Sequence, residues 1–145
     1  MFLPNGVERD KFNFNFDQWA FRRKFVPDNY KLVMSVGRMV PEKGFQVLIN
    51  ATTNVLYNYP NVRFVISGKG PMLDNLRNQV EYMGLSDRVW FLGYTSDEDL
   101  NKLFVVSDIA VFPSLYEPFG ITAIEAMAAG TPVVVSDTGG LGEIC

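Results

Sequence analysis

The pattern of apolar and polar positions changes its periodicity several times along this chain. From Lys31 onward, short runs of β-branched and aromatic residues alternate with longer segments of helical pattern. The predicted strands are Leu32–Val36, Val62–Ser67, Arg88–Leu92, Ile109–Pro113 and Pro132–Ser136. The predicted helices are Lys43–Tyr59, Met72–Met83, Asp97–Val106 and Gly120–Ala129. This alternation predicts an α/β fold in which a parallel sheet lies between two layers of helices.

Residues 1–30 follow a different pattern. They contain a predicted turn at Pro4–Gly6, scattered aromatic residues and a short predicted helix around Asp17–Phe25, which Pro27 ends. We therefore divide the chain into a lead-in or interdomain segment, residues 1–30, and one α/β domain, residues 31–145.

Helix ends carry recognisable signals within the α/β domain. Ser96 precedes a predicted helix, where its hydroxyl can cap the backbone amide of Glu98 or Asp99. Gly84 and Gly130 stand where helices require a left-handed residue to stop. These signals support the predicted boundaries.

The composition fits one globular domain and excludes several function classes. The chain has 145 residues, of which 48% are hydrophobic and 20% are charged. Its net charge is −3 and no run of five like charges occurs, so neither nucleic acid nor an acidic membrane surface is an expected partner. The absence of histidine excludes Ser-His triads, imidazole acid–base chemistry and most zinc sites.

Cysteine usage and hydropathy bear on the cellular compartment. The only cysteine is Cys145, so no internal disulfide can form. No apolar run approaches the roughly 18 residues that a membrane span requires, and the first residues lack the apolar stretch of a signal peptide. We expect a soluble, cytoplasmic protein.

The predicted topology places one crevice where ligands bind. Right-handed crossovers with one reversal of winding give the strand order 3-2-1-4-5, which opens a crevice at the carboxyl ends of strands 1 and 4. The loop after strand 1, residues 37–44, carries Arg38 and Lys43. The loop after strand 4, residues 114–120, carries Glu117 and leads into a helix N-terminus. Cations that face a helix N-terminus form an anion site.

Arg38 and Lys43 are suited to a diphosphate. A planar guanidinium grips phosphate oxygens through two parallel hydrogen bonds, and an ammonium group adds a compact charge. Gly37 and Gly44 would let the backbone approach a ligand closely. Either cation alone could be an ordinary solvated charge, but the position at the switch point favours binding.

Glu125 is the one charged residue of an otherwise apolar predicted helix. Such a helix is buried on most sides, and an ionised carboxylate there requires a partner or an opening. A functional role would be to accept two hydrogen bonds from a vicinal diol such as a ribose. A salt bridge, or a polar stripe facing water, is the structural alternative.

Two glycine-rich loops stay ambiguous. Gly68-Lys69-Gly70 is not a dinucleotide fingerprint, because Leu73 stands where the third glycine belongs. We interpret it as a tight turn whose lysine reaches either the crevice or solvent. Residues 139–142 either cradle an anion or sugar with free amides or form a plain connection.

Three short motifs carry a resemblance to a known family. They are Gly37-Arg38 with Glu42-Lys43-Gly44, Gly68-Lys69-Gly70-Pro71, and Glu117-Pro118-Phe119-Gly120-Ile121 with Glu125 eight positions after Glu117. Together they resemble the donor-binding domain of glycosyltransferase family 4, whose members are retaining enzymes of the GT-B fold. The resemblance covers almost the whole chain and implies a Rossmann-like three-layer α/β/α domain with a parallel sheet, one half of a GT-B fold.

The resemblance also implies a function and a set of site residues. It implies the nucleotide-sugar donor-binding domain of a retaining, metal-independent hexosyltransferase of carbohydrate biosynthesis, with no cofactor. The implied catalytic residues are Arg38 and Lys43, which bind the diphosphate, and Glu117, which contacts the sugar hydroxyls. The implied donor-binding residues are Gly37, Glu117, Phe119, Gly120, Ile121 and Glu125, of which Glu125 holds the ribose. The stretch Val89–Gly93 would line the base.

The resemblance finally implies that further chain is needed for activity. GT-B enzymes have a second domain, normally N-terminal, that carries the acceptor site. We therefore expect a domain truncated at its C-terminal end, inactive alone, whose partners are a nucleotide-sugar donor and the missing acceptor domain. The alternatives are a nucleotide-sugar epimerase of the same fold, which the glutamate pair disfavours, and a non-catalytic flavodoxin-like domain. A receiver domain of that kind would carry aspartates where this chain has Gly37-Arg38.

Overall fold

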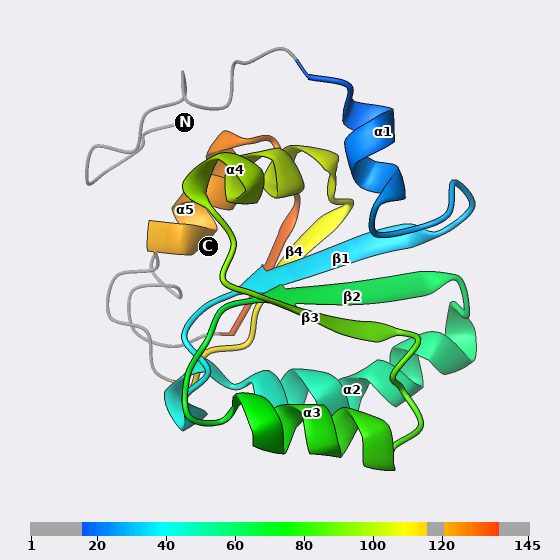
Figure 1. The fold of residues 1–145 in the computed structure, drawn as a ribbon, viewed down its shortest axis with the longest axis vertical. Coiled ribbons are helices and arrows are strands. Elements are labelled where there is room, and N and C mark those ends of the chain that lie inside the picture. Colours follow the sequence, from blue (N-terminus) through cyan, green and yellow to red (C-terminus); the bar gives the residue numbers. More distant parts are fainter. Residues whose placement is uncertain (1–15, 116–120, 137–145) are drawn as a thin grey trace.

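The protein alternates strands and helices from β1 to β5. The computed structural model describes residues 16–115 and 121–136. The elements are α1 (Gln18–Arg23), β1 (Lys31–Val36), a 3₁₀ turn (Pro41–Lys43), α2 (Phe45–Asn58), β2 (Val62–Ser67), α3 (Leu73–Tyr82), β3 (Val89–Gly93), α4 (Asp97–Val106), β4 (Ile109–Phe112), α5 (Ile121–Ala128) and β5 (Val133–Val135) (Figure 1). Every predicted strand and helix is present, with bounds that differ by at most two residues.

The sheet has the predicted strand order. Its five strands lie in the order β3-β2-β1-β4-β5, and every neighbouring pair is parallel. β1 pairs with β2 along its whole length and with β4 at Val33 and Met34. The winding direction therefore reverses between β1 and β4, which is the topological switch point of this class of sheet.

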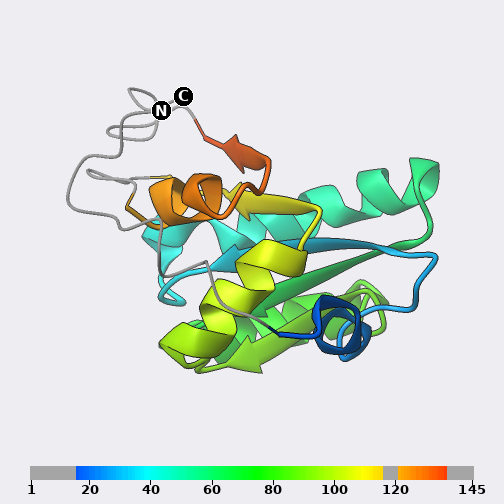
Figure 2. The ribbon, with the colours of Figure 1, turned by 90° about the horizontal axis from the view of Figure 1, so that it is seen from above.

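Helices cover both faces of the sheet. α1, α4 and α5 lie on one face, and α2 and α3 lie on the other (Figures 1 and 2). Successive side chains of β1 point to opposite faces of the sheet. Leu32 and Met34 pack with Phe104 of α4, whereas Val33 packs with Ile49 of α2. The result is two apolar cores, one on each side of a buried sheet, in a Rossmann-like three-layer α/β/α fold.

Helix α1 is tied to the domain by a partly buried arginine. The Arg22 guanidinium donates hydrogen bonds to the carbonyl oxygens of Tyr30 and Val106, both at 2.7 Å, and to Asp108 Oδ2 at 2.9 Å. Asp108 Oδ2 also accepts the backbone N–H of Leu32 at 2.8 Å. One carboxylate thus ties α1 to the start of β1 and to the end of α4.

The predicted helix ends are confirmed. The Asp99 N–H donates to Ser96 Oγ at 3.2 Å, as the sequence predicts for a cap of α4. Gly84 and Gly130 follow α3 and α5 with φ of 72° and 85°, the left-handed conformation that ends a helix. Among the described residues, no helix has the length and apolar character that crossing a membrane would require.

Candidate functional site

The loops after β1, β2 and β4 meet at the carboxyl edge of the sheet. The Met39 N–H donates to the Lys69 carbonyl at 2.9 Å, and the Met72 N–H donates to the Met39 carbonyl at 3.0 Å. On the other side, the Leu115 N–H donates to the Glu42 carbonyl at 2.7 Å. The loop of residues 37–44 is therefore held between its two neighbours, at the predicted switch point.

Two glycines make this close packing possible. Gly44 has φ of 72°, and a Cβ added there would lie 2.0 Å from the carbonyl oxygen of Pro113. Gly68 has φ of 140°, and its Cβ would lie 1.9 Å from the carbonyl oxygen of Gly37. The sequence analysis expects Gly44 to let a ligand approach the backbone. In the structure, the backbone of the loop after β4 is what lies against Gly44. These glycines are needed because neighbouring loops touch backbone to backbone.

Arg38 and Lys43 occupy the two ends of the loop after β1. Arg38 is exposed, and Lys43 is half-buried. A Cβ at Gly37 would lie 3.5 Å from Lys43 Cδ, so the lysine stem folds back along its own loop. Between them, Met39 is fully buried and anchors the loop in the core beneath α2. The loop is thus fixed by its backbone and by Met39, while the guanidinium of Arg38 is open to solvent.

Helix α5 is apolar, as the sequence predicts, but only part of it is buried. Ala123, Ile124 and Ala126 are all at most 2% exposed. Glu125, between them, is half-buried, which is less than the sequence suggests. A partly solvated carboxylate avoids most of the cost of full burial. The convergence of Glu125 with Arg38 and Lys43 upon one ligand stays a prediction.

Several predicted site residues lie outside the described part of the chain. These are Glu117, Phe119 and Gly120, together with the glycine loop of residues 139–142. Ile121 is the first residue of α5, so the helix N-terminus follows directly on the loop after β4, as predicted.

The stretch that the sequence predicts to line the base is the edge strand of the sheet. Val89–Gly93 is β3 itself, an edge strand, and its side chains line a hollow beside α3. The residues at the carboxyl edge are those just beyond it, Tyr94–Ser96. Tyr94 is 74% exposed, and Thr95 is held by the buried hydroxyl of Ser67, which donates to Thr95 Oγ1 at 2.6 Å.

Lys69 is placed beside the loop that carries Arg38. Its carbonyl accepts the Met39 N–H, and its side chain is exposed. The sequence left its role undecided, and the structure adds that it belongs to the same carboxyl edge. Within residues 16–115 and 121–136, no three carboxylate, cysteine or histidine side chains are grouped so that they could hold a metal ion.

Known proteins similar to this chain are glycosyltransferases. The chain is 44% identical over 146 residues to an uncharacterized glycosyltransferase of Methanocaldococcus jannaschii, covering 98% of this chain and 37% of that protein. It is 40% identical over 151 residues to mannosylfructose-phosphate synthase of Agrobacterium fabrum, covering 96% of this chain and 33% of that protein. The chain thus spans about a third of the length of these curated relatives.

Solved structures and a family model agree with these relatives. Crystal structures of HepE from Anabaena, one with UDP and glucose and one with UDP-glucose, match with a TM-score of 0.85 at 29% identity, over 97% of this chain and 39% of that chain. The fold is the Rossmann-like α/β fold of GT-B glycosyltransferase structures. The model for glycosyl transferases group 1 matches residues 17–145. The chain therefore belongs to the glycosyl transferases group 1 family.

Proposed function

We propose that this chain is the nucleotide-sugar donor-binding domain, the C-terminal half, of a GT-B glycosyltransferase of family 4. The observation that carries the proposal is the set of backbone hydrogen bonds that joins the loops after β1, β2 and β4. These bonds fix the loop that carries the exposed Arg38 at the switch point of a parallel sheet. The complexes of HepE with UDP and UDP-glucose support a nucleotide sugar as the ligand class. Family membership favours a transferase over the epimerase and the non-catalytic alternatives.

The diphosphate is the part of the donor that Arg38 and Lys43 would bind. Arg38 is exposed on a loop whose backbone is fixed, so binding would order only its side chain. Lys43 is folded back along the same loop, which keeps both cations near one ligand. The Arg38 guanidinium would grip two phosphate oxygens, and the Lys43 ammonium would balance the remaining charge.

Two glutamates and the start of α5 would bind the rest of the donor. Glu125 would accept hydrogen bonds from the ribose diol, and Glu117 would contact the sugar hydroxyls. Backbone amides at Phe119, Gly120 and Ile121 would point at the sugar and phosphate, because a helix N-terminus carries partial positive charge. The loop Tyr94–Ser96, rather than β3, would lie against the base, since it is the exposed segment at the carboxyl end of that strand.

Catalysis would consist of stabilising the leaving group. Negative charge grows on the bridging phosphate oxygen as the glycosidic bond breaks, and fixed cations lower the energy of that state. Loss of one such group costs roughly 10²–10³ in rate in other enzymes. In the proposed reaction the acceptor attacks from the face that the nucleoside diphosphate leaves, so configuration is retained. Arg38 and Lys43 would supply the positive charge, and no metal would be required.

Sugar transfer would need a second domain. This chain spans about a third of its curated relatives, and the acceptor would bind on the part of the enzyme that faces the carboxyl edge from the other side. We therefore propose that the chain alone binds a nucleoside diphosphate and does not transfer a sugar.

Nucleotide titration with a matched charge variant tests the proposal. UDP, ADP and GDP are titrated by calorimetry into the chain, into Arg38→Ala and into Lys31→Ala. Lys31 is also exposed and lies at the opposite end of β1, so its variant removes the same charge far from the carboxyl edge. A charge-assisted bidentate contact is worth about 1.5–3 kcal/mol, so Arg38→Ala should weaken binding by roughly 10- to 100-fold. Equal affinities for the two variants would refute the site.

A further inference from the structure

The outer edge of the sheet is an apolar strand that pairs on one side only, within the described residues. β3 is the end strand of the sheet, and its sequence, Val-Trp-Phe-Leu-Gly, contains no charge and no proline. Natural edge strands are usually protected by lysine, proline or a covering segment, because their free N–H and C=O groups attract another strand. A bulge at Leu92 interrupts the pairing of β3 with β2, and the Val89 N–H already donates to the Leu85 carbonyl at 2.9 Å. The edge is therefore open to pairing at Phe91, in the middle of the strand.

The backbone groups of Phe91 point away from the sheet. Val89, Trp90 and Phe91 pair with Phe64, Val65 and Ile66 of β2, and the Phe64 N–H donates to the Arg88 carbonyl at 2.8 Å. Since N–H and C=O groups alternate sides along a strand, those of Trp90 face β2 and those of Phe91 face outward. A strand that docks on β3 would find its hydrogen-bonding partner at Phe91.

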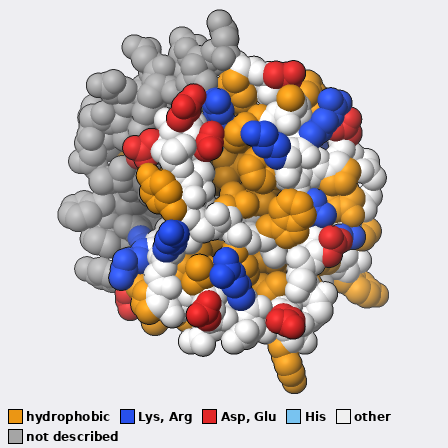
Figure 3. All heavy atoms as spheres, viewed as in Figure 1, with side chains coloured by type: hydrophobic (Ala, Val, Ile, Leu, Met, Phe, Trp, Pro, Cys, Tyr) orange, Lys and Arg blue, Asp and Glu red, His pale blue; other side chains and the backbone are white. Residues whose placement is uncertain are grey.

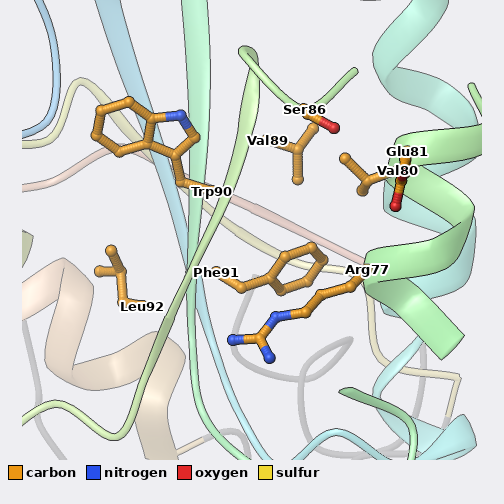
Figure 4. Close-up of a pocket in the computed structure, with 8 residues that line it drawn as sticks. All are labelled: Arg77, Val80, Glu81, Ser86, Val89, Trp90, Phe91 and Leu92. Carbon is orange, nitrogen blue, oxygen red and sulfur yellow. The ribbon is translucent and has the colours of Figure 1, made fainter. Parts of the chain in front are cut away.

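The surface around this edge is apolar and hollowed. Val89–Leu92 line a hollow of about 430 Å³ together with Arg77, Val80 and Glu81 of α3. Figure 4 shows Val89 and Phe91 pointing toward α3, with Arg77 extended beside Phe91, whereas Trp90 and Leu92 point to the other side of the strand. In Figure 3, apolar side chains gather across the middle of this face, with basic and acidic side chains around them. Exposed apolar patches of this kind mark interaction surfaces.

The two charges beside the edge, Arg77 and Glu81, could pair with the same two charges on a second copy of the chain. Arg77 and Glu81 are one turn apart on α3, both are exposed, and neither forms an ion pair within the described residues. A two-fold axis perpendicular to the sheet, midway between the Phe91 residues of two copies, would set a second β3 antiparallel to the first. It would also set the two α3 helices antiparallel on one face, with Arg77 of each copy opposite Glu81 of the other. A foreign strand would have no reason to match this arrangement.

We propose that two copies of this chain pair through their β3 edges into one continuous sheet. The Phe91 N–H of each copy donates to the Phe91 carbonyl of the other, and Trp90 of each copy packs on Leu92 of the other. Such cross-strand aromatic contacts stabilise antiparallel pairs. The Arg77–Glu81 pairs lie on the opposite face, over Phe91. The carboxyl edge with Arg38 and Lys43 stays open in this dimer, because it lies at the strand ends and not at the side of the sheet.

The test measures mass against concentration for the chain and its charge variants. Sedimentation equilibrium should show the mass rising from that of the 16.4 kDa monomer toward twice that value. Glu81→Arg sets like charges against each other twice across the axis and should raise the dimer dissociation constant by about tenfold or more. Asp74→Arg makes the same charge change on α3 outside the hollow and should leave the constant unchanged.

Restoring the charges should restore the dimer. The double variant Arg77→Glu/Glu81→Arg, or an equimolar mixture of Arg77→Glu and Glu81→Arg, should regain the original affinity. Amide hydrogen exchange at Phe91 should slow as the concentration rises. A chain that stays monomeric throughout, a dimer that responds equally to Asp74→Arg and Glu81→Arg, or a dimer that leaves the Phe91 amide unprotected would each overturn the proposal.

Discussion

Replacement of Gly44 by alanine should destabilise the protein strongly. The residue has φ of 72°, and an alanine in that conformation costs about 1–2 kcal/mol. Its Cβ would lie 2.0 Å from the Pro113 carbonyl oxygen, whereas ordinary contact begins near 3.4 Å. The loops after β1 and β4 would have to separate by more than 1 Å, which breaks the 2.7 Å hydrogen bond from Leu115 to Glu42.

The magnitude follows from these three costs. Forcing extra volume into a closely packed site costs about 1–3 kcal/mol, and the lost hydrogen bond costs about 1 kcal/mol more. With the backbone strain, Gly44→Ala should lower the free energy of unfolding by roughly 3–6 kcal/mol. Gly84→Ala is the matched control, because Gly84 has the same φ of 72° and a Cβ there meets nothing within 4 Å. It should cost only the backbone strain, about 1–2 kcal/mol.

Urea denaturation followed by tryptophan fluorescence measures both variants on one scale. Trp90 is partly buried against the core and reports loss of tertiary structure. The difference between the two variants isolates the clash from the backbone conformation, because the latter is common to both. If Gly44→Ala and Gly84→Ala lose the same stability, the loops do not touch as described and the reasoning about the carboxyl edge is refuted.

Three further outcomes are expected. Asp108→Asn weakens the contacts to Arg22 and to the Leu32 N–H, and it should lower the free energy of unfolding in urea by about 1–3 kcal/mol. The loss is smaller than for a fully buried pair because a third of the Asp108 side chain is exposed, and an unchanged urea midpoint would contradict this. Ser96→Ala removes the cap of α4 and should cost about 1 kcal/mol, with faster amide exchange at Asp99; unaltered exchange would contradict the cap. Addition of a chelator should leave UDP affinity unchanged in calorimetry, and a loss of affinity would contradict the proposal that the diphosphate is bound without a metal ion.

The sheet could be predicted because its causes are local in the sequence. Each strand is a short apolar run between turn residues, and handedness rules leave few ways to join parallel strands. The helix caps at Ser96, Gly84 and Gly130 depend on residues within one turn, so they too were predictable. The strand order followed from right-handed crossovers and from the one reversal of winding assumed for this fold class.

Contacts between distant segments could not be predicted. The Arg22–Asp108 pair joins residues 86 positions apart, and no sequence pattern around either residue predicts that the two are in contact. Arg63, a buried arginine, packs its guanidinium 4.0 Å from the ring centroid of Trp90, and the sequence offers no reason to pair them. The sequence marked Gly44 as a place of close approach, but it could not show that the Pro113 carbonyl lies there.

The residues that fix the loop after β1 are different from the residue that would bind the ligand. Gly44 and Met39 fix the loop by backbone contact and burial, whereas Arg38 contributes an exposed side chain and no packing. A prearranged loop lowers the cost of binding, since only side chains remain to be ordered. Arg38→Ala should therefore weaken nucleotide binding at unchanged stability, while Gly44→Ala should lower both, although it removes no charge. If Arg38→Ala lowered stability as much as Gly44→Ala does, the arginine would be a structural residue and the proposed division of roles would fail.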